Sequence, residues 1–503
     1  MILSHTQHQR LGLIVAGLLL AILMASMDNT IVVTAMGTIV GDLGGLDSFV
    51  WVVSAFMVAE MAGMPIFGKL SDMYGRKRFF LFGSILFMAG SALCGTAASI
   101  EQLSIYRAIQ GIGGGALIPI AFTIIFDIFP PEKRGKISGL FGAVFGQSSI
   151  FGPLIGAYIT DYISWHWVFY INLPLGLISF LLILLFYKEA KQHEKQKIDW
   201  FGAITLVGAV VCLMFALELG GEKYAWDSSI ILLFFGGSAI LFICFFLIER
   251  KASEPIISFE MFKNRLFAAS TLVALCYGAT FISATIQIPI FVQGVYGDSA
   301  TNSGLILLPM MLGSVISAQI GGFLTTKMSY RNIMLISGLL LVTGFSLLST
   351  LHTGTPRLLL TGYMIVVGLG VGFSFSVLSM AAIHHFGPRQ RGSATSTSNF
   401  LRSLGMTVGA SIFGMLQKNS FSEQMSDLFT GAEMPGLSSQ HDANQILSSA
   451  RSSIPADILN WITEALSNSI VHTFSWAILS AAAAFLLVFL MPKDRMQITA
   501  KSK

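Results

Sequence analysis

Four charged side chains lie deep within long apolar runs of the sequence, at Asp28, Glu60, Arg107 and Arg402. A charge in the middle of a bilayer costs about 2.5–3.5 kcal/mol on insertion scales, so such a residue marks function by default. A buried carboxyl group can take up a proton when a neighbouring Arg moves away. We therefore interpret Asp28 and Arg107 as a proton site, with a static helix-tying pair as the alternative.

The sequence does not decide the roles of two of the four charged residues. Glu60 suits either proton transfer or contact with a cationic substrate, because both need an accessible carboxylate. Arg402 has no evident partner in the sequence, so a structural role and a functional role both fit it.

The apolar runs that surround these charges predict an all-α integral membrane protein. Apolar residues make up 54% of the 503 residues and charged residues 11%, against about 25% in soluble domains. Runs of about 20 apolar residues can each cross the bilayer, which places the chain in the cell membrane as a multi-pass protein. We expect fourteen spans, at about 11–36, 50–68, 79–98, 102–126, 137–159, 167–187, 200–219, 228–248, 266–292, 303–324, 332–351, 358–383, 393–416 and 469–491.

The distribution of Lys and Arg predicts the orientation. With these spans, 24 of the 30 basic residues fall in loops on one side, 4 fall on the other and 2 lie within spans. Cytoplasmic loops are enriched in Lys and Arg, so we expect both termini to be cytoplasmic.

An internal repeat divides the chain. Pro131–Gly135 recurs as Pro388–Gly392, an offset of 257, and the three glycines at 111, 113 and 115 recur at 368, 370 and 372. This predicts two homologous six-helix halves, a common transporter design, with two helices inserted between them. The expected units are 1–190, 191–265 and 266–503, the last including a long outside loop at 417–468 with a short interfacial helix.

Five motifs occur in order along the chain. They are Met27-Asp28-Asn29-Thr30, Gly68-Lys-Leu-Ser-Asp72-Met-Tyr-Gly75-Arg76-Lys77-Arg78, Arg107-x-x-Gln110-Gly111, Gly152-Pro153-x-x-Gly156, and Trp165-His166-Trp167 with Asn172. Together they resemble the motifs of the major facilitator superfamily, and of its fourteen-helix drug:proton antiporters in particular, and the match covers nearly the whole chain. Ala157 and Ser148 stand where the antiporter motif usually has glycine, and Glu60 stands where the family has an apolar residue.

The resemblance implies the major facilitator fold and a proton-coupled multidrug exporter that works by alternating access. It needs no cofactor, because the proton gradient supplies the energy. Asp72 can cap a helix or pair with a basic residue, which would lock the inner gate. The expected gate residues are Gly68, Asp72, Gly75, Arg76 and Lys77, and the antiporter motif is Gly152, Pro153 and Gly156.

We expect an apolar substrate cavity with few polar anchors, which suits amphipathic and often cationic molecules. The proposed anchors are Gln110, Gln287, Asn399 and Arg402. Small molecules, protons and the lipid bilayer are the expected partners of a monomer, with no nucleic acid.

Two alternatives differ in function. One is a dedicated exporter of a single metabolite, lipid or antibiotic on the same scaffold, since fold does not decide substrate. The other, a membrane-embedded enzyme, would need a cluster of catalytic side chains, and the pair His384-His385 has no acid nearby in sequence. We expect no metal site or disulfide, because the four cysteines lie in separate apolar runs.

Overall fold

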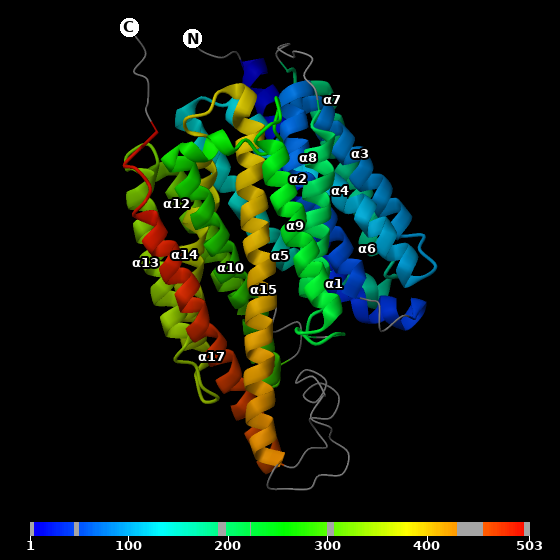
Figure 1. Ribbon diagram of the computed structural model, residues 1–503, viewed down its shortest axis with the longest axis vertical. Helices are drawn as coiled ribbons and strands as arrows, with labels where there is room; N and C mark the ends of the chain where they lie inside the picture. Colours follow the sequence, from blue (N-terminus) through cyan, green and yellow to red (C-terminus); the bar gives the residue numbers. More distant parts are fainter. Residues whose placement is uncertain are drawn as a thin grey trace.

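The computed structural model describes residues 5–44, 50–189, 198–221, 223–298, 306–429 and 456–496. In these ranges the chain is a bundle of long helices lying side by side (Figure 1). The start of α1 and the end of α17 lie at the same end of the bundle (Figure 1). An isolated bridge between Gly220 and Tyr224 is the one strand-like pairing there. The predicted all-α class is therefore confirmed.

The first half contains the helices that carry most of the predicted site. A single residue separates its last two helices, so α6 and α7 together fill the sixth predicted span. The helices are α1 (His5–Leu43), α2 (Val50–Tyr74), α3 (Arg76–Cys94), α4 (Ile100–Ile128), α5 (Pro131–Tyr162), α6 (Trp167–Tyr170) and α7 (Asn172–Phe186).

An inserted pair and a second half follow. The pair is α8 (Trp200–Leu219) and α9 (Ser229–Glu249), and a short 3₁₀ turn, η1 (Phe259–Lys263), leads into the second half. The second half is α10 (Arg265–Gly294), α12 (Leu308–Leu324), α13 (Tyr330–Leu348), α14 (Arg357–Ile383), η2 (Pro388–Gln390), α15 (Arg391–Phe429) and α17 (Ala456–Val488).

Polar side chains fix where several helices begin. Ser99 accepts a hydrogen bond from the Gln102 N–H at the start of α4, at 3.3 Å. Asp199 does the same for Gly202 at the start of α8, at 2.8 Å. The first N–H groups of a helix have no partner within it, so these caps stabilise the predicted helix starts.

The two halves repeat the same helix contacts, as the sequence repeat predicts. α2 packs on α4 as α12 packs on α14, and α1 packs on α5 as α10 packs on α15. Across the seam between the halves, α5 packs on α12 and α15 packs on α2. The fifth helix of each half therefore joins that half to the other one.

The repeated glycines allow these close packings. A Cβ atom at Gly113 would lie 2.5 Å from the Phe87 backbone nitrogen of α3. At Gly370, one repeat later, it would lie 2.7 Å from the Leu341 backbone nitrogen of α13. Small residues let membrane helices approach at backbone distance, so the glycine repeat is explained by packing.

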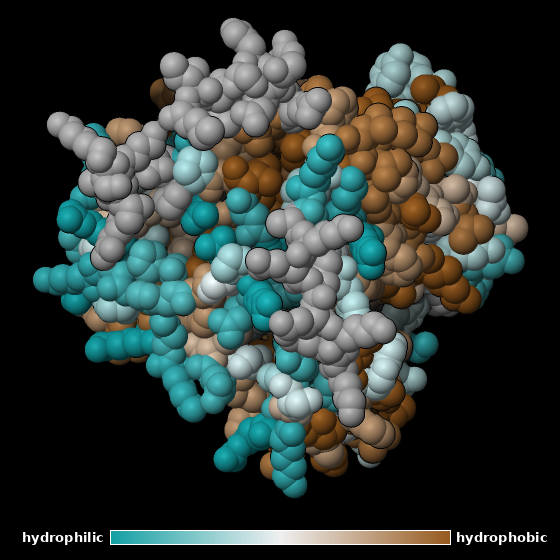
Figure 2. Space-filling view, turned by 90° about the horizontal axis from the view of Figure 1, so that it is seen from above, coloured by the Kyte–Doolittle hydropathy of each residue, from teal (hydrophilic) through white to brown (hydrophobic). Residues whose placement is uncertain are grey.

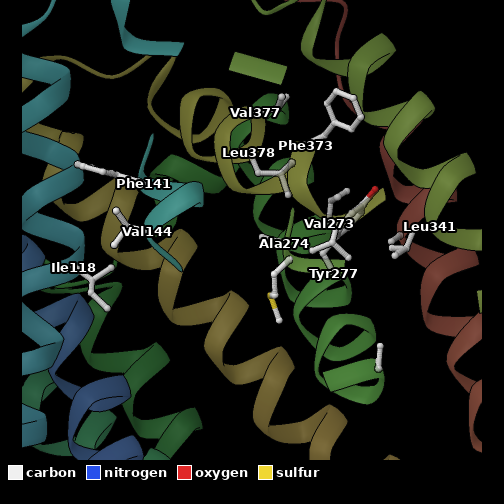
Figure 3. Packing of buried hydrophobic residues seen from close by; sticks show 14 of the residues in the cluster. Ile118, Phe141, Val144, Val273, Ala274, Tyr277, Leu341, Phe373, Val377 and Leu378 are labelled. Atoms are coloured by element: carbon white, nitrogen blue, oxygen red, sulfur yellow. The ribbon is translucent and has the colours of Figure 1, made fainter. Parts of the chain in front are cut away.

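Apolar side chains from both halves belong to one buried cluster. Figure 3 shows Phe141 and Val144 of α5 on one side and Val377 and Leu378 of α14 on the other. Phe141 also packs edge-on against Phe122 of α4, with ring centroids 4.6 Å apart.

Large apolar side chains also cover the outside of the bundle. Leu185, Phe201 and Leu233 are 64%, 76% and 75% exposed. Figure 2 shows that hydrophilic residues gather on the end face, while apolar residues lie toward the flanks. Helices satisfy their own backbone groups, so this surface suits a multi-pass protein in lipid.

Eleven helices among the described residues are long and apolar enough to cross a membrane. α12 is apolar but shorter, and α5 and α15 are long but more polar. Each of the fourteen predicted spans overlaps a helix of the structure. The total of fourteen crossings stays a prediction.

Helices extend into both ends of the segment predicted as a long outside loop at 417–468. α15 continues to Phe429, and α17 begins at Ala456 as one helix with the last span, without a separate interfacial helix. Residues 430–455 lie outside the described residues. Hydropathy misses these extensions because they are half polar, whereas Phe421 and Met425, one turn apart, are buried.

The inserted pair packs on α2. The rings of Trp51 in α2 and Phe215 in α8 lie 4.6 Å apart. Near the other end of α2, Lys69 Nζ lies 2.6 Å from Glu254 Oε2. α8 and the segment that follows α9 therefore contact the first half near the two ends of α2.

Candidate functional site

Asp28 and Arg107 form an ion pair inside the first half. Arg107 Nη1, from α4, donates a hydrogen bond to Asp28 Oδ2 in α1. Both side chains are completely buried. The structure thus brings together the two residues that the sequence analysis paired.

The second oxygen of Asp28 is occupied by amide groups. Gln110 Nε2 donates to Asp28 Oδ1 at 2.8 Å, and Asn172 Nδ2 donates to the same atom at 2.6 Å. Asn172, at the start of α7, also donates to Ser91 Oγ of α3 at 3.0 Å. Buried charges need such partners, so donors from α4 and α7 converge on the carboxylate of α1, and α3 joins the network through Asn172.

Arg107 is held on all sides. Its Nε donates to the Val52 carbonyl at 3.1 Å, and its Nη2 donates to Asn29 Oδ1 at 3.3 Å. Its Cζ lies 4.1 Å from the ring centroid of Phe56, a cation–π contact. The guanidinium therefore links α4 to both α1 and α2.

Glu60 lies close to this network but differs from Asp28 in exposure. Its side chain interacts with Asn29, which also binds Arg107. Glu60 is only partly buried, and no salt bridge involves it among the described residues. It is therefore the more accessible of the two acids.

A second group of charges joins the halves at the end of α2. Asp72 Oδ1 accepts from the Gly392 N–H at 2.9 Å, and Asp72 Oδ2 accepts from the Ser393 N–H at 2.8 Å. Arg76 Nη2 also donates to Asp72 Oδ1, at 3.2 Å. Asp72 therefore caps α15 and pairs with a basic residue, and it does so across the seam between the halves.

Asp127, at the end of α4, joins this charged cluster and was missed by the sequence analysis. It forms an ion pair with Arg76, and Arg391 Nη1 donates to its Oδ1 at 3.2 Å. Arg76 also donates to the Pro388 carbonyl of the second half. The available signal was an acid at the end of an apolar run, just before the repeated Pro131–Gly135 segment.

The remaining gate residues shape the same region. Lys77 Nζ donates to the carbonyls of Leu184 and Tyr187, at 2.7 and 2.6 Å. Gly75 has φ 110°, which strains any other residue. A Cβ at Gly68 would lie 2.8 Å from the Gly392 carbonyl oxygen, so glycine lets α2 and α15 touch.

The antiporter motif packs α5 against α1 beside Asp28. A Cβ at Gly152 would lie 2.8 Å from Thr30 Cβ, and one at Gly156 would lie 2.9 Å from the Ile31 carbonyl oxygen. α5 runs through Pro153 without interruption, although proline lacks the N–H for one backbone bond. The motif therefore packs against the segment of α1 that directly follows Asp28.

This arrangement agrees with a comparison to known families. The sequence pattern of the Major Facilitator Superfamily matches residues 18–410. The chain belongs to the major facilitator superfamily. Members of the superfamily are transporters rather than enzymes, so this chain is a transporter of the cell membrane.

Named relatives lie in the same superfamily. Multidrug resistance protein 3 of Bacillus subtilis is 58% identical over 495 residues, which cover 97% of this chain and 96% of the relative. The multidrug transporter protein MdtP of the same organism is 40% identical over 402 residues, covering 80% and 74%. The crystal structure of the human organic anion transporter MFSD10 shares the fold, with a TM-score of 0.60, 16% identity and coverage of 95% and 99%.

The predicted cavity anchors divide into two groups in this superfamily member. Gln110 is completely buried, and its amide binds Asp28 and Arg107, so it belongs to the charge network instead of the cavity wall. Gln287 Oε1, Asn399 Nδ2 and Arg402 Nε are buried, and no described residue forms a hydrogen bond with these atoms. Sequence reasoning could not separate the groups, because burial and partners depend on packing.

The pair His384-His385 gains partners that are distant in sequence. Tyr330 Oη lies 3.1 Å from His384 Nδ1, and His385 Nε2 lies 2.9 Å from Asp494 Oδ2. Burial lowers the pKa of His384, the charge of His385 lowers it further, and Asp494 opposes the shift. Within the described residues, no three His, Cys, Asp or Glu side chains gather as metal ligands do.

Proposed function

We propose that this transporter is a proton-coupled exporter of amphipathic, often cationic compounds that works by alternating access. The observation that carries the proposal is the completely buried pair of Asp28 and Arg107. A buried charge within a span is expensive and marks ion or substrate pathways. The names of the two Bacillus relatives, which refer to multidrug resistance and transport, support the substrate class.

Coupling follows from what Asp28 does when its partners move. While Arg107, Gln110 and Asn172 bind the carboxylate, their charge-assisted hydrogen bonds compensate for its burial. If α4 shifts and withdraws Arg107, the lone buried carboxylate becomes unfavourable, and the group takes up a proton. Proton binding and substrate binding then favour opposite-facing states, and this difference in affinity couples them.

The contacts of Asp72 with Arg76 and with the start of α15, here called the Asp72 latch, would hold one of these states. In the present structure it joins α2 to the start of α15, so the seam is closed at this end. With both termini in the cytoplasm, this is the inner gate. Glu60, partly exposed and near the pair, would contact the cationic group of the substrate.

The energy comes from the proton gradient, with no cofactor, and the protein acts as a monomer. The membrane potential supplies about 2.3 kcal/mol per charge per 100 mV.

Dye efflux from loaded vesicles tests the proposal. A protonophore should stop efflux of a cationic dye, and ATP should not restore it. Efflux driven by ATP after the gradient has collapsed would contradict proton coupling. Transport of a single metabolite, with no dye accepted, would instead identify a dedicated exporter.

The orientation has a separate test. A cysteine placed near Arg134 should react only with a reagent applied from inside, and one placed near Ser439 only with a reagent applied from outside. The opposite pattern would overturn the proposed topology.

A further inference from the structure

One face of α15 carries three buried polar atoms without partners. Thr395 Oγ1, Asn399 Nδ2 and Arg402 Nε have no hydrogen-bond partner within the part of the chain that the structure describes. The three residues are spaced four and three apart, which places them along a single face of a helix. A buried polar group left unpaired costs about 1–3 kcal/mol, so the face lacks an acceptor that its N–H donors could use.

Arg402 has the strongest need for such an acceptor. Its Nη2 donates to the Ser374 carbonyl at 2.9 Å, but no salt bridge neutralises its charge among the described residues. The other deep Arg, Arg107, has the Asp28 carboxylate. A guanidinium can bind a carboxylate with two parallel hydrogen bonds, which is the geometry that Arg402 leaves unused.

Aromatic side chains lie beside this free charge. The Arg402 Cζ lies 4.9 Å from the ring centroid of Phe375, and Phe281 of α10 packs edge-on against Phe375 with centroids 6.0 Å apart. A Cβ at Gly142 of α5 would lie 3.7 Å from Phe375 Cβ, so the first half reaches this position too. The site therefore adjoins the seam between the halves.

Arg402 also lies at about the depth of Glu60. α2 and α15 run in opposite directions from the contact between Asp72 and Gly392. Ten helical residues separate Gly392 from Arg402 and twelve separate Asp72 from Glu60, which amount to about 15 and 18 Å. The two opposite charges flank the seam at similar depth without forming a salt bridge among the described residues.

We propose that Asn399 and Arg402 form a subsite for an anionic group, in particular a carboxylate, on the transported molecule. This inference rests on the proposed function and extends it. With Glu60 receiving a cationic group and Phe375 contacting a ring, the preferred substrates are aromatic zwitterions as well as cations.

A matched pair of dyes tests this subsite. The pair is a rhodamine with a free carboxylate and its methyl ester, which differ only in the anionic group. Dissociation constants are measured by fluorescence polarisation on the full-length purified protein in lipid nanodiscs. Arg402→Gln should weaken binding of the carboxylate dye at least about tenfold, because a charged bidentate contact is lost, and should change the ester less than about twofold.

Further variants sharpen the test. Arg402→Lys should give an intermediate loss, because it keeps the charge but not the planar fork. Asn399→Leu should also weaken the carboxylate dye selectively, and it carries the test if Arg402→Gln does not fold. Arg357→Gln is the matched control, since this Arg pairs with Asp298 and is 59% exposed, and it should change neither dye.

The outcomes separate the two proposals. Equal losses for both dyes, or an unchanged carboxylate dye in the Arg402 and Asn399 variants, would overturn the subsite. Wild-type binding of the ester alone would also overturn the subsite while leaving multidrug export intact. Failure of the wild-type protein to bind either dye would overturn both.

Discussion

The two halves share one packing scheme but differ in the chemistry placed on it. Gly152 of α5 meets Thr30 of α1, and Gly409 of α15, its repeat counterpart, meets Ala279 of α10. Asp28 lies two residues before Thr30, and Tyr277 lies two residues before Ala279. The position that holds a carboxylate in the first half therefore holds a neutral phenol in the second.

The partners differ in the same way. Arg107 is replaced at the repeat offset by Met364, and Tyr277 finds its hydrogen bond in Ser337 Oγ at 2.8 Å. Both sites are buried, so burial alone does not select charge. A neutral hydrogen bond satisfies the packing, and the ion pair in the first half therefore calls for a functional explanation.

The ends of the halves show a second contrast. At the repeat offsets, Arg76 and Asp127 correspond to Tyr330 and His384. The first pair is an ion pair, whereas the second is a hydrogen bond involving a half-buried His. The contact in the first half is held by opposite charges, and the one in the second half involves a His whose pKa is lowered by burial.

The largest effect should come from Asp28→Asn. The substitution keeps the shape and removes the titrating group, so substrate-linked proton exchange should be abolished while substrate still binds. Proton release or uptake on adding substrate to purified protein, across pH, measures this. Tyr277→Phe, the counterpart change, should leave coupling intact and lower stability by about 1 kcal/mol through the lost hydrogen bond.

Glu60→Gln tests the rival assignment, in which Glu60 and not Asp28 carries the coupled proton. If Glu60 contacts cations, its loss should weaken cationic substrates more than neutral ones and leave proton exchange in place. Proton exchange retained in Asp28→Asn but abolished in Glu60→Gln would reverse the two roles.

The next largest effect should come from Asp72→Asn. The substitution removes a carboxylate that accepts hydrogen bonds from two N–H groups of α15 and from Arg76. Hydrogen bonds to charged groups contribute about 1.5–3 kcal/mol each. Efflux rates in vesicles should fall at least about tenfold at equal expression. Thr326→Val, at the position in the second half that corresponds to Asp72, should retain nearly full transport. An equal loss of transport there would mean that both halves depend on a polar contact at this position.

Pro153→Ala should reduce export to a smaller extent. The helix remains, but the missing backbone hydrogen bond is restored and α5 stiffens beside Asp28. Efflux is compared at matched membrane insertion, with Pro289→Ala in α10 as the control. Full transport would assign Pro153 to packing alone.

The smallest effect concerns pH and His384. Because its pKa is lowered from the ordinary 6.5, the unfolded chain binds this proton more readily, and stability falls as pH drops below about 6.5. His384→Gln should reduce the loss of thermal stability between neutral and acidic pH. His352→Gln, on the other side of the helix bundle, serves as control, and an identical pH profile in wild type and His384→Gln would contradict the burial argument.

The sequence predicted much of this structure because membrane helices have a strong local signal. Each predicted span overlaps a helix, and the repeat correctly indicates which helices correspond. The extension of α15 was missed because the burial of Phe421 and Met425 depends on packing, which a local hydropathy window does not register. The short helix expected before the last span is present as the first part of α17. Asp127 was missed because an acid at the end of a span looks like any solvated loop charge.

The sequence by itself determined the class, the family and the deep charges, since apolar length, glycine spacing and a charge within a span are local properties. The sequence already paired Asp28 with Arg107, and tertiary structure decided the other partners. It gave Gln110 and Asn172 to Asp28, gave Asp72 to the start of α15, and left Arg402 without an acid among the described residues. The physical reason is that hydrogen bonds act over about 3 Å, and only the packing of distant helices brings the donors and acceptors that close.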